Sequence, residues 1–359
     1  MSTRPRVLVA PLDWGLGHAT RCVPVIRALL ARGAAVSIAS NGNAMDLLKI
    51  EFPNLPTYEL PSYNIKYSRG TGFMWHLFLQ APRLLAIVRR EHKVLERLVD
   101  RGGFDVVIAD NRFGCWTRKA KTVFITHQLH ILMPPAFKWI EPIVNFFNRR
   151  FIKSFDVCWI PDLEGSALSG KLSLTKIRSV RNIGWLSRFS KSTVQHPKKY
   201  YCLGIVSGPE PQRALFEQRL REQLQLLNEP CALVKGIPTG ARAWSDNGRV
   251  AEIDHLPSDE MLRMIEQSEW IIARSGYSTI MDLATIGAQA IFVPTPGQTE
   301  QEYLASKLKA EGIALFQSQS EFEIKSALAM AKKYRGFATN AQPPNLLTHA
   351  IAELLHELD

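Results

Sequence analysis

The fold of this chain is decided by residues 270–304, which read WIIARSGYSTIMDLATIGAQAIFVPTPGQTEQEYL. Residues 270–273 and 290–294 are short apolar runs, as is typical of buried parallel strands. An Arg-Ser-Gly turn follows the first run, and a helix is expected to begin near Ser278. The stretch therefore predicts a strand, a helix and a second strand, which is the repeating unit of a doubly wound α/β fold.

Polar residues gather where these two strands are expected to end. Ser278 and Thr279 lie at the helix start, where free backbone N–H groups and the helix dipole attract phosphate oxygens. Asp282 lies one turn further along, and a carboxylate there can accept hydrogen bonds from a ribose diol. Amide and carboxylate side chains follow the second strand at Gln298, Gln301 and Glu302. A phosphate-binding turn, a diol acceptor and a polar cluster, in this order, predict a nucleotide-sugar site.

This segment resembles the donor half of the GT-B glycosyltransferases, and in particular the MurG-like enzymes of glycosyltransferase family 28. In that family an Arg-Ser-Gly turn, a helix acid and a late Gln pair hold a UDP-sugar. Two positions depart from the family pattern: Asp282 replaces the usual Glu, and Glu302 replaces the second Gln, so the donor sugar stays open. The resemblance and the position of the remaining strand ends imply donor binding by Ser207, Gly208, Leu256, Arg274, Ser275, Gly276, Ser278, Thr279, Asp282, Gln298, Gln301 and Glu302.

Length and composition are those of a two-domain globular protein. The chain has 359 residues, of which 46% are hydrophobic. It enters a strand without a secretory signal, and no apolar run approaches the roughly 20 residues that span a bilayer. The five cysteines are scattered without a CxxC pair, which indicates neither a disulfide framework nor a zinc site. We therefore expect a reduced, cytoplasmic location.

Positive charge is concentrated in the first half of the chain. Residues 1–190 hold 27 Lys and Arg against 13 Asp and Glu, whereas residues 191–359 hold 17 against 20. Such an asymmetry indicates an anionic partner, which can be a membrane surface, a lipid phosphate or a nucleic acid. No nucleic-acid recognition motif is present, so we expect no nucleic-acid partner.

Both halves follow the same order of elements. In the first half we expect a helix at about 21–32 and strands at 6–11, 36–40, 105–110, 122–125 and 156–160. In the second half we expect strands at 201–207, 231–235, 250–253, 270–273 and 290–294. The polar segment 187–199 separates them.

The expected fold class is therefore α/β with GT-B architecture, that is, two doubly wound Rossmann-like domains facing a central cleft. Residues 1–190 are expected to form the acceptor and membrane domain, and residues 191–359 the nucleotide-sugar domain. The resemblance further implies that the final helix, at about 345–358, crosses back to the first domain.

A Gly-rich loop with Gly15, Gly17 and His18 follows the first strand. The NAD fingerprint requires a third Gly, where Thr20 stands, and an acid at the end of the second strand, which is missing. NAD is therefore not expected. Family 28 enzymes carry a loop that ends in Gly-His at this place, so the resemblance places these glycines on the acceptor side.

Two residues are candidates for a general base. His18 is an imidazole at a helix start, and Asp110 is a carboxylate at a strand end. The alternatives are a local hydrogen bond for His18 and turn chemistry for Asp110. Arg112 and His127 follow neighbouring strands and are expected on the acceptor side. The sequence has no Asp-x-Asp motif and no metal-ligand spacing, so neither a metal nor a cofactor is expected.

Two segments combine basic and apolar residues. The first, 73–98, has a helical apolar stripe at 77–98 that we expect to pack in the core. The second, 137–153, has apolar residues around most of the helix, which favours contact with an anionic membrane surface. MurG-like enzymes also bind membranes through their first domain.

These observations predict a metal-independent hexosyltransferase at the inner face of the membrane, and the resemblance implies that it inverts the anomeric carbon. The expected donor is a UDP-sugar, for which UDP-N-acetylglucosamine is a candidate, and the expected acceptor is a lipid-linked or membrane-embedded glycan. Two alternatives remain open. One is a UDP-sugar 2-epimerase of the same fold, and the other is a non-catalytic protein that binds sugar nucleotides or lipids.

Overall fold

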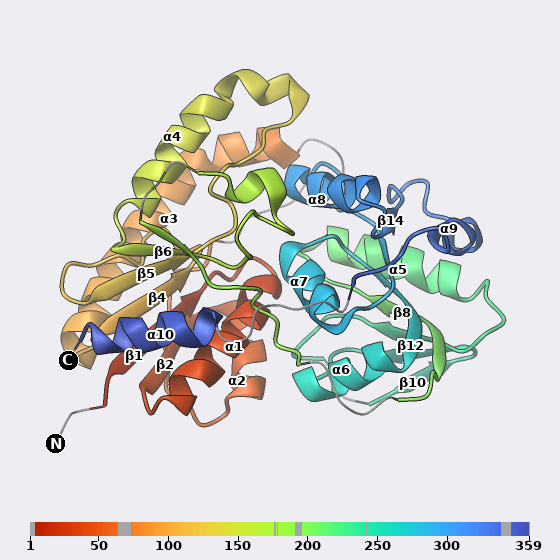
Figure 1. Ribbon diagram of the computed structural model, residues 1–359, viewed down its shortest axis with the longest axis horizontal. Coiled ribbons are helices and arrows are strands. Elements are labelled where there is room, and N and C mark those ends of the chain that lie inside the picture. Colours follow the sequence, from red (N-terminus) through yellow and green to blue (C-terminus); the bar gives the residue numbers. More distant parts are fainter. Residues whose placement is uncertain are drawn as a thin grey trace. The chain divides into compact units, whose positions relative to one another are not determined.

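The computed structural model describes residues 4–63, 73–175, 177, 179–190, 196–240, 243–338 and 346–358. The chain forms two compact units (Figure 1). The first contains Met1–Ile65, Leu77–Arg188 and Ala341–Asp359, and the second contains Lys66–His76 and Phe189–Asn340. The change of unit after Arg188 falls in the polar segment 187–199, of which residues 191–195 lie outside the described residues.

The first unit is built on a seven-stranded parallel sheet with the order β3-β2-β1-β4-β5-β6-β7. Its strands are β1 (Arg6–Pro11), β2 (Ala35–Ser40), β3 (Thr57–Glu59), β4 (Val106–Asp110), β5 (Lys121–Ile125), β6 (Val157–Ile160) and β7 (Val180–Asn182). Its helices are α1 (Gly17–Ala31), α2 (Gly42–Glu51), α3 (Phe73–Gly102), α4 (Glu141–Ile152) and α10 (Leu346–His356), with 3-10 turns η1 (Pro135–Ile140) and η2 (Gly170–Ser173). Side chains of α3 and α4 pack on one face of the sheet, and α1 contacts α2 and α10.

The strand order of the first unit reverses between β1 and β4. The chain runs outward from β1 to β3 and then returns to β4 on the other side of β1. Loops that leave the two strands therefore diverge, and open α/β sheets bind ligands at such a switch point. Pro11 pairs with Asp110 in the register, so the last residues of both strands lie side by side.

The second unit repeats this arrangement with the order β10-β11-β9-β8-β12-β13-β14. Its strands are β8 (Tyr200–Ile205), β9 (Cys231–Val234), β10 (Ser245–Asn247), β11 (Val250–Ile253), β12 (Ser268–Ala273), β13 (Ala290–Phe292) and β14 (Leu315–Phe316). All of them run parallel except the edge strand β10. Its helices are α5 (Gln212–Leu224), α6 (Ser258–Glu266), α7 (Tyr277–Ile286), α8 (Thr299–Ala310) and α9 (Ile324–Ala331). The switch point lies between β8 and β12, where Ile205 pairs with Ala273.

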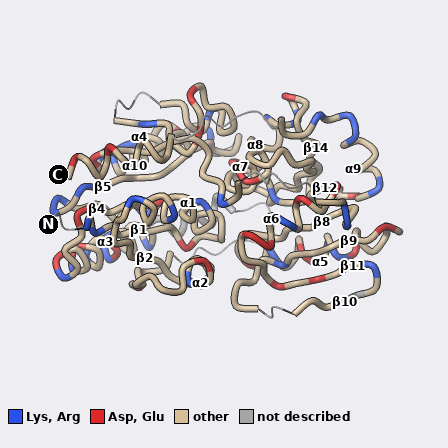
Figure 2. The backbone as a smooth tube through the Cα atoms, turned by 60° about the horizontal axis from the view of Figure 1, so that its bottom comes forward, with Lys and Arg blue, Asp and Glu red and all other residues tan. Residues whose placement is uncertain are grey.

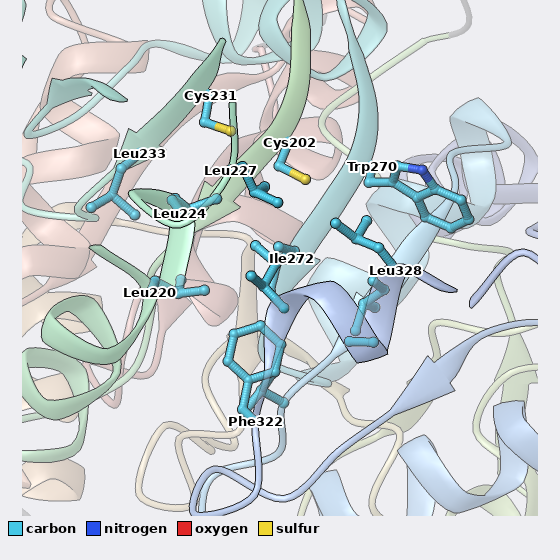
Figure 3. Packing of buried hydrophobic residues seen from close by; sticks show 14 of the residues in the cluster. Cys202, Leu220, Leu224, Leu227, Cys231, Leu233, Trp270, Ile272, Phe322 and Leu328 are labelled. Atoms are coloured by element: carbon cyan, nitrogen blue, oxygen red, sulfur yellow. The ribbon is translucent and has the colours of Figure 1, made fainter. Parts of the chain in front are cut away.

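A dense apolar core holds α5 and α9 on the sheet of the second unit (Figure 3). Leu220 and Leu224 of α5 approach the backbone of Gly204, the last residue but one of β8. A Cβ atom at Gly204 would lie 3.3 Å from the Cδ1 atoms of both leucines and 2.8 Å from Leu233 Cδ1 of β9, so glycine permits this close packing. The helix thereby reaches the sheet directly beneath the switch point.

The apolar runs of the sequence correspond to the observed strands, with ends that differ by at most two residues. The helix after the first strand, expected at about 21–32, begins earlier, at Gly17. The reason is that the amide of Thr20 donates to the carbonyl of Leu16, which closes the first turn inside the Gly-rich loop. This early start places His18 on the helix instead of in the loop.

The final helix, α10, belongs to the first unit, although it follows the second in the chain. It contacts α1 and buries Ala350, Ile351 and Leu354. Surface ion pairs join Glu353 to Arg181 and Glu357 to Lys121, all within the same unit.

Candidate active site

The first candidate site lies at the switch point of the first unit. Gly15, in the loop between β1 and α1, has a φ of +78°, which favours glycine. Gly17 then begins α1, so His18 and Arg21 are one helical turn apart on the same face. That face meets the end of β4, where the last residue is Asp110.

A hydrogen-bonded cluster forms around the Asp110 carboxylate. His18 Nδ1 lies 2.7 Å from Asp110 Oδ1. The Arg21 guanidinium donates to both carboxylate oxygens, from Nε to Oδ2 and from Nη2 to Oδ1. Asp110 is 0% exposed and its side chain cannot reach a substrate, whereas the His18 side chain is 15% exposed. In the tautomer whose Nδ1–H donates to Asp110, His18 Nε2 carries the lone pair and can accept a proton.

The charges in this cluster oppose each other. Burial would raise the pKa of the Asp110 carboxyl, but Arg21 and then His18 outweigh it and hold that pKa below its usual value. Burial lowers the pKa of His18, and the Arg21 charge lowers it further against the opposing effect of Asp110. The cluster therefore presents an ionised, buried carboxylate and an uncharged imidazole at neutral pH.

Two residues expected on the acceptor side are buried. His127 follows β5; its Nδ1 is 3.4 Å from Arg21 Nη1, and its carbonyl accepts from Ser173. Arg112 is fully buried: its Nε donates to the Pro11 carbonyl at 2.8 Å and its Nη1 to Glu91 at 2.6 Å. Contrary to the expectation of a contact with the acceptor, Arg112 braces the loop that follows β1.

The second candidate site lies at the switch point of the second unit. Ser207 and Gly208 follow β8, and Gly208 has a φ of +107° with open space where a Cβ would lie. At the start of α5 beyond them, a side chain of the protein itself binds a backbone amide. The Glu210 carboxylate accepts from the amide of Ala214 at 3.2 Å and pairs with Arg213 at 2.5 Å.

The Arg-Ser part of the turn after β12 supports the loops and is not accessible. Arg274 is buried and donates to the carbonyls of Val293, Pro294 and Gln212, each within 3.1 Å. Its guanidinium lies 4.0 Å from the ring centre of Phe216, and burial lowers the pKa of Arg274 to about 9. The expected contact between this arginine and a diphosphate is therefore replaced by a brace beneath the strand ends.

Ser275 ties this turn to the neighbouring helix. Its hydroxyl is buried and donates to the Gln301 carbonyl at 2.8 Å. Gln301 in turn accepts the amide of Thr295 at 2.8 Å on its side-chain oxygen, and Glu302 accepts the amide of Gly297 at 2.9 Å. Gln298 stands immediately before α8 as its N-cap. These contacts fix the polar loop that the sequence assigned to sugar binding.

The start of α7 has an open N-cap position, and Ser278 and Asp282 beyond it are buried, at 9% and 7% exposed. Its N-cap is Gly276, which provides no side-chain cap, and a Cβ atom there would meet no neighbour within 4 Å. Ser278 and Asp282 are four residues apart and share one face of the helix. Thr279 beside them is half-buried. Helix-start amides, two hydroxyls and one carboxylate therefore lie on the first turns of one helix.

Leu256 lies in the loop after β11, in the same unit. Its side chain is buried, and among the described residues its backbone groups have no hydrogen-bond partner. A backbone N–H and C=O of this kind can pair with the edge of a nucleobase.

The helix α4 of the first unit buries polar side chains and exposes large apolar ones. The buried residues of α4 include Glu141, Asn145 and Asn148, whose side chains bind the loop before it. Asn145 exchanges two hydrogen bonds with the backbone of Ile131, at 2.7 and 2.9 Å, and Asn148 donates to the Gln128 carbonyl at 2.9 Å. Four of the residues exposed on η1 and α4 are large and apolar: Trp139 (75%), Ile143 (55%), Phe146 (57%) and Phe147 (54%). We call these four residues the apolar face of α4.

Basic residues border the apolar face of α4. The nearest in sequence are Lys138, Arg150 and Lys153, all exposed. The tube in Figure 2 carries Lys and Arg along much of the first unit. The other basic segment lies on α3, where Leu95 packs in the core and Leu98 packs against it partly buried, as its stripe predicted, whereas Leu85 is exposed. The side chains of 73–79 lie outside the described residues.

The described part of the chain has neither a membrane-spanning helix nor a metal-binding cluster. None of the helices there is long and apolar enough to cross a membrane. In the same residues, no group of three or more His, Cys, Asp or Glu is arranged to hold a metal ion.

Arg21 and Glu91 are the residues of this site that the sequence did not reveal. Arg21 carries a usable signal, because it follows His18 by one helical turn. Glu91 carries none, because its partner Arg112 lies on another element.

Residues 245–344 match the family model described as "Glycosyltransferase family 28 C-terminal domain". An uncharacterized glycosyltransferase of Methanosarcina mazei is 23% identical over 343 residues, which cover 88% of this chain and 86% of that protein. A UDP-N-acetylglucosamine--N-acetylmuramyl-(pentapeptide) pyrophosphoryl-undecaprenol N-acetylglucosamine transferase of Methylobacterium radiotolerans is 35% identical over 100 residues, or 25% of this chain and 27% of that enzyme. The crystal structure of Acinetobacter baumannii MurG superimposes with a TM-score of 0.57 at 15% identity and covers 99% of this chain and 100% of that one.

Proposed function

This chain is a glycosyltransferase of the GT-B fold with a C-terminal domain of glycosyltransferase family 28, and we propose that it transfers a hexose from a UDP-sugar to a lipid-linked acceptor. N-acetylglucosamine is the first candidate sugar, because the relative from Methylobacterium radiotolerans carries that sugar in its name. The acceptor is a glycan on a lipid at the inner face of an anionic membrane.

The donor site is the open start of α7. The diphosphate binds the backbone amides after Gly276 together with the Ser278 and Thr279 hydroxyls, and the Asp282 carboxylate accepts the ribose hydroxyls. Ser207 and Gly208 border the diphosphate, the backbone of Leu256 pairs with uracil, and the loop of Gln298, Gln301 and Glu302 contacts the sugar. Arg274 and Ser275 hold these loops in place from beneath.

The base is His18, and Asp110 is its positioning residue. The Nε2 atom of His18 takes the proton from the acceptor hydroxyl while that oxygen attacks the anomeric carbon of the donor sugar. The bond from this carbon to the diphosphate oxygen breaks, and UDP leaves with the electron pair. Helix-start amides of α7 stabilise the charge that develops on the leaving group. A single displacement of this kind inverts the anomeric centre.

The single observation that supports this proposal best is the uncapped start of α7 with Asp282 one turn away. It lies within the residues that match the family model. Because the N-cap residue is Gly276, no side chain occupies the place beside the first amides of the helix.

The experiment is a UDP-release assay with a set of UDP-sugars, with and without vesicles that carry a polyprenyl-diphosphate-linked glycan. Transfer predicts UDP release only when donor and acceptor are both present, and its loss in Asp282→Ala. The matched control is Asp259→Ala, an exposed acid on α6 of the same unit. Conversion of the donor without acceptor would identify an epimerase instead, and donor binding without turnover would identify a binding protein.

Membrane attachment occurs through the apolar face of α4. A helix that buries its asparagines and exposes two phenylalanines and a tryptophan gains free energy when the exposed face enters the interface of a bilayer. The basic residues beside it attract anionic headgroups. Lipid is therefore the partner that fits both the apolar and the charged parts of this surface.

Sedimentation with vesicles tests this attachment. The double variant Phe146→Ser/Phe147→Ser should lose about tenfold or more in binding for each Phe removed, with an unchanged melting temperature, because both side chains are exposed. Leu226→Ser, an exposed leucine of the second unit, is the control. Equal binding of the double variant and the wild type to phosphatidylglycerol vesicles would refute the role of α4.

A further inference from the structure

Arg21 is the most constrained residue of the first site, although neither the family pattern nor the proposed chemistry gives it a role. It is buried and its guanidinium contacts three side chains from three elements. It grips both oxygens of Asp110, its Nη2 lies 2.8 Å from His18 Nδ1, and its Nη1 lies 3.4 Å from His127 Nδ1.

Asp110 and Arg21 both contact the same nitrogen atom, Nδ1 of His18. His18 Nδ1 lies 2.7 Å from the Asp110 carboxylate and 2.8 Å from the Arg21 guanidinium. A carboxylate alone would accept a hydrogen bond from a protonated Nδ1 and would stabilise the imidazolium. A guanidinium at the same distance repels a second positive charge, and its two bonds to Asp110 already neutralise much of the carboxylate.

We propose that Arg21 is the positioning residue of the base: it locks the Asp110 carboxylate in one orientation and keeps the His18 imidazole uncharged. The inference rests on the proposed role of His18 as the base. A bidentate pair fixes the rotation of the carboxylate, which in turn fixes the ring that contacts it. The uncharged ring is the form that can accept a proton from the acceptor.

The groups that face His18 from each packed element agree with this role. From α1 they are Arg21 and Cys22, from β4 Asp110, and from the loop after β5 His127. Burial raises the pKa of the Cys22 thiol far above its usual value, so this group stays uncharged. Arg21 is therefore the only fixed positive charge among the groups of this cluster, all of which lie in the described part of the chain.

The charge of Arg21 can be removed with little change in size. In Arg21→Gln the Asp110 carboxylate faces His18 without a competing cation, so the pKa of His18 should rise. At pH 6.5 more of the base is then protonated, and kcat/KM should fall about tenfold or more. Activity should recover as the pH is raised, because the base itself is intact.

The test combines an NMR titration of ¹³C-labelled histidine with pH profiles of kcat/KM for the full-length protein. The His18 resonance is assigned with His18→Ala, and UDP affinity and melting temperature report on the fold. Arg27→Gln is the matched control, because Arg27 lies on the same helix with its side chain 45% exposed and pairs with Glu51. We expect a raised His18 pKa and an acid limb at higher pH in Arg21→Gln, and neither in Arg27→Gln.

An unchanged His18 pKa with an equal loss of activity at every pH would overturn the proposal and leave Arg21 a structural role only. If Arg21→Gln does not fold, Arg21→Lys decides: lysine keeps the charge but cannot bind both oxygens, so kcat should fall while KM for the UDP-sugar and the acid limb stay unchanged. Wild-type kinetics in Arg21→Lys would contradict the positioning role. Absence of transfer activity in the wild type would refute the proposed function together with the role of His18 as the base, whereas wild-type transfer with an unchanged His18 pKa in Arg21→Gln would refute this inference alone.

Discussion

Single residues divide the chemistry of the first unit between an accessible group and a buried one. The His18 side chain is partly exposed, whereas the side chains of Asp110 and Arg21 are buried. A carboxylate in that position can orient and polarise the imidazole but cannot contact an acceptor hydroxyl. The two candidates for the base are thereby assigned different roles in the proposed reaction.

His18→Ala should lower kcat by about 10²- to 10⁴-fold, the usual contribution of a general base, with UDP affinity unchanged. Asp110→Asn should lower kcat less, because the base remains but loses its oriented partner. Single-turnover assays and UDP titrations measure the two quantities separately. A large loss of UDP affinity in either variant would show that the cluster binds the donor instead.

The pH dependence of the wild-type enzyme follows from the lowered pKa of His18. The base acts when it is neutral, so kcat/KM should be constant at neutral pH and should fall as the pH drops through that pKa. Because burial and Arg21 lower it, the midpoint of the acid limb should lie below 6.5, the ordinary histidine value. A midpoint above 6.5 would contradict the neutral-imidazole cluster.

The candidate site could be predicted from sequence only where its residues act locally. Ser278, Thr279 and Asp282 are placed by one turn and one helix, so their spacing predicted a shared face. Arg112 and Arg274 could not be placed, because their burial depends on partners far along the chain, such as Glu91 for Arg112. A sequence pattern does not show whether an arginine faces a ligand or the interior.

Among the elements, α7 has the helix start at which we propose that the diphosphate binds. Gly276 has backbone angles of −69° and 142°, which suit an N-cap, but it has no side chain to fill that place. A cap introduced there would stabilise the helix and occupy the phosphate position at the same time. Stability and donor affinity should therefore change in opposite directions.

Gly276→Asp should raise the melting temperature of the free protein slightly, because Asp is a better N-cap than Gly by about a few tenths of a kcal/mol. The same variant should weaken UDP binding by about tenfold or more, because its carboxylate repels the diphosphate. Gly276→Asn is the control, since it provides a cap without charge and should retain more affinity. If Asp and Asn weaken UDP equally, size and not charge is responsible, and the electrostatic account of α7 fails.

At this scale the sequence predicted the long central strands and missed the short edge strands. The strands β4 and β12 are continuous apolar runs because helices cover both faces of the sheet. By contrast β3, β7 and β14 have only two or three residues, too few for a recognisable pattern. The start of α1 was misplaced because glycines are poor helix formers, although the tertiary setting closes a turn there.

At the scale of the whole molecule, the end of the chain belongs to the same unit as its beginning. The last helix, α10, packs on α1, the helix that carries His18, and its buried face consists of Ala350, Ile351 and Leu354. The first unit is therefore complete only when the chain has passed through the second. The resemblance to GT-B enzymes implied this crossing, whereas composition and periodicity did not.

Deletion of residues 346–359 should lower the melting temperature of the first unit by many degrees. Burial of Ile351 and Leu354 contributes about 1.5–3 kcal/mol each, a large share of the 5–15 kcal/mol typical of a domain. Glu353→Ala/Glu357→Ala, which removes only exposed ion pairs, is the control and should change the melting temperature little. Calorimetry that finds the truncated chain as stable as the full chain would show that α10 is dispensable.

The measurement that tests the central claim most directly is calorimetric titration of UDP, with NAD as a negative ligand, into the wild type, Asp282→Ala and Asp259→Ala. The account predicts binding of UDP to the wild type and to Asp259→Ala, and a loss of about 1.5–3 kcal/mol, or roughly ten- to a hundredfold in affinity, in Asp282→Ala. Absence of UDP binding to the wild type, or equal affinity in both variants, would contradict the placement of the donor site at α7.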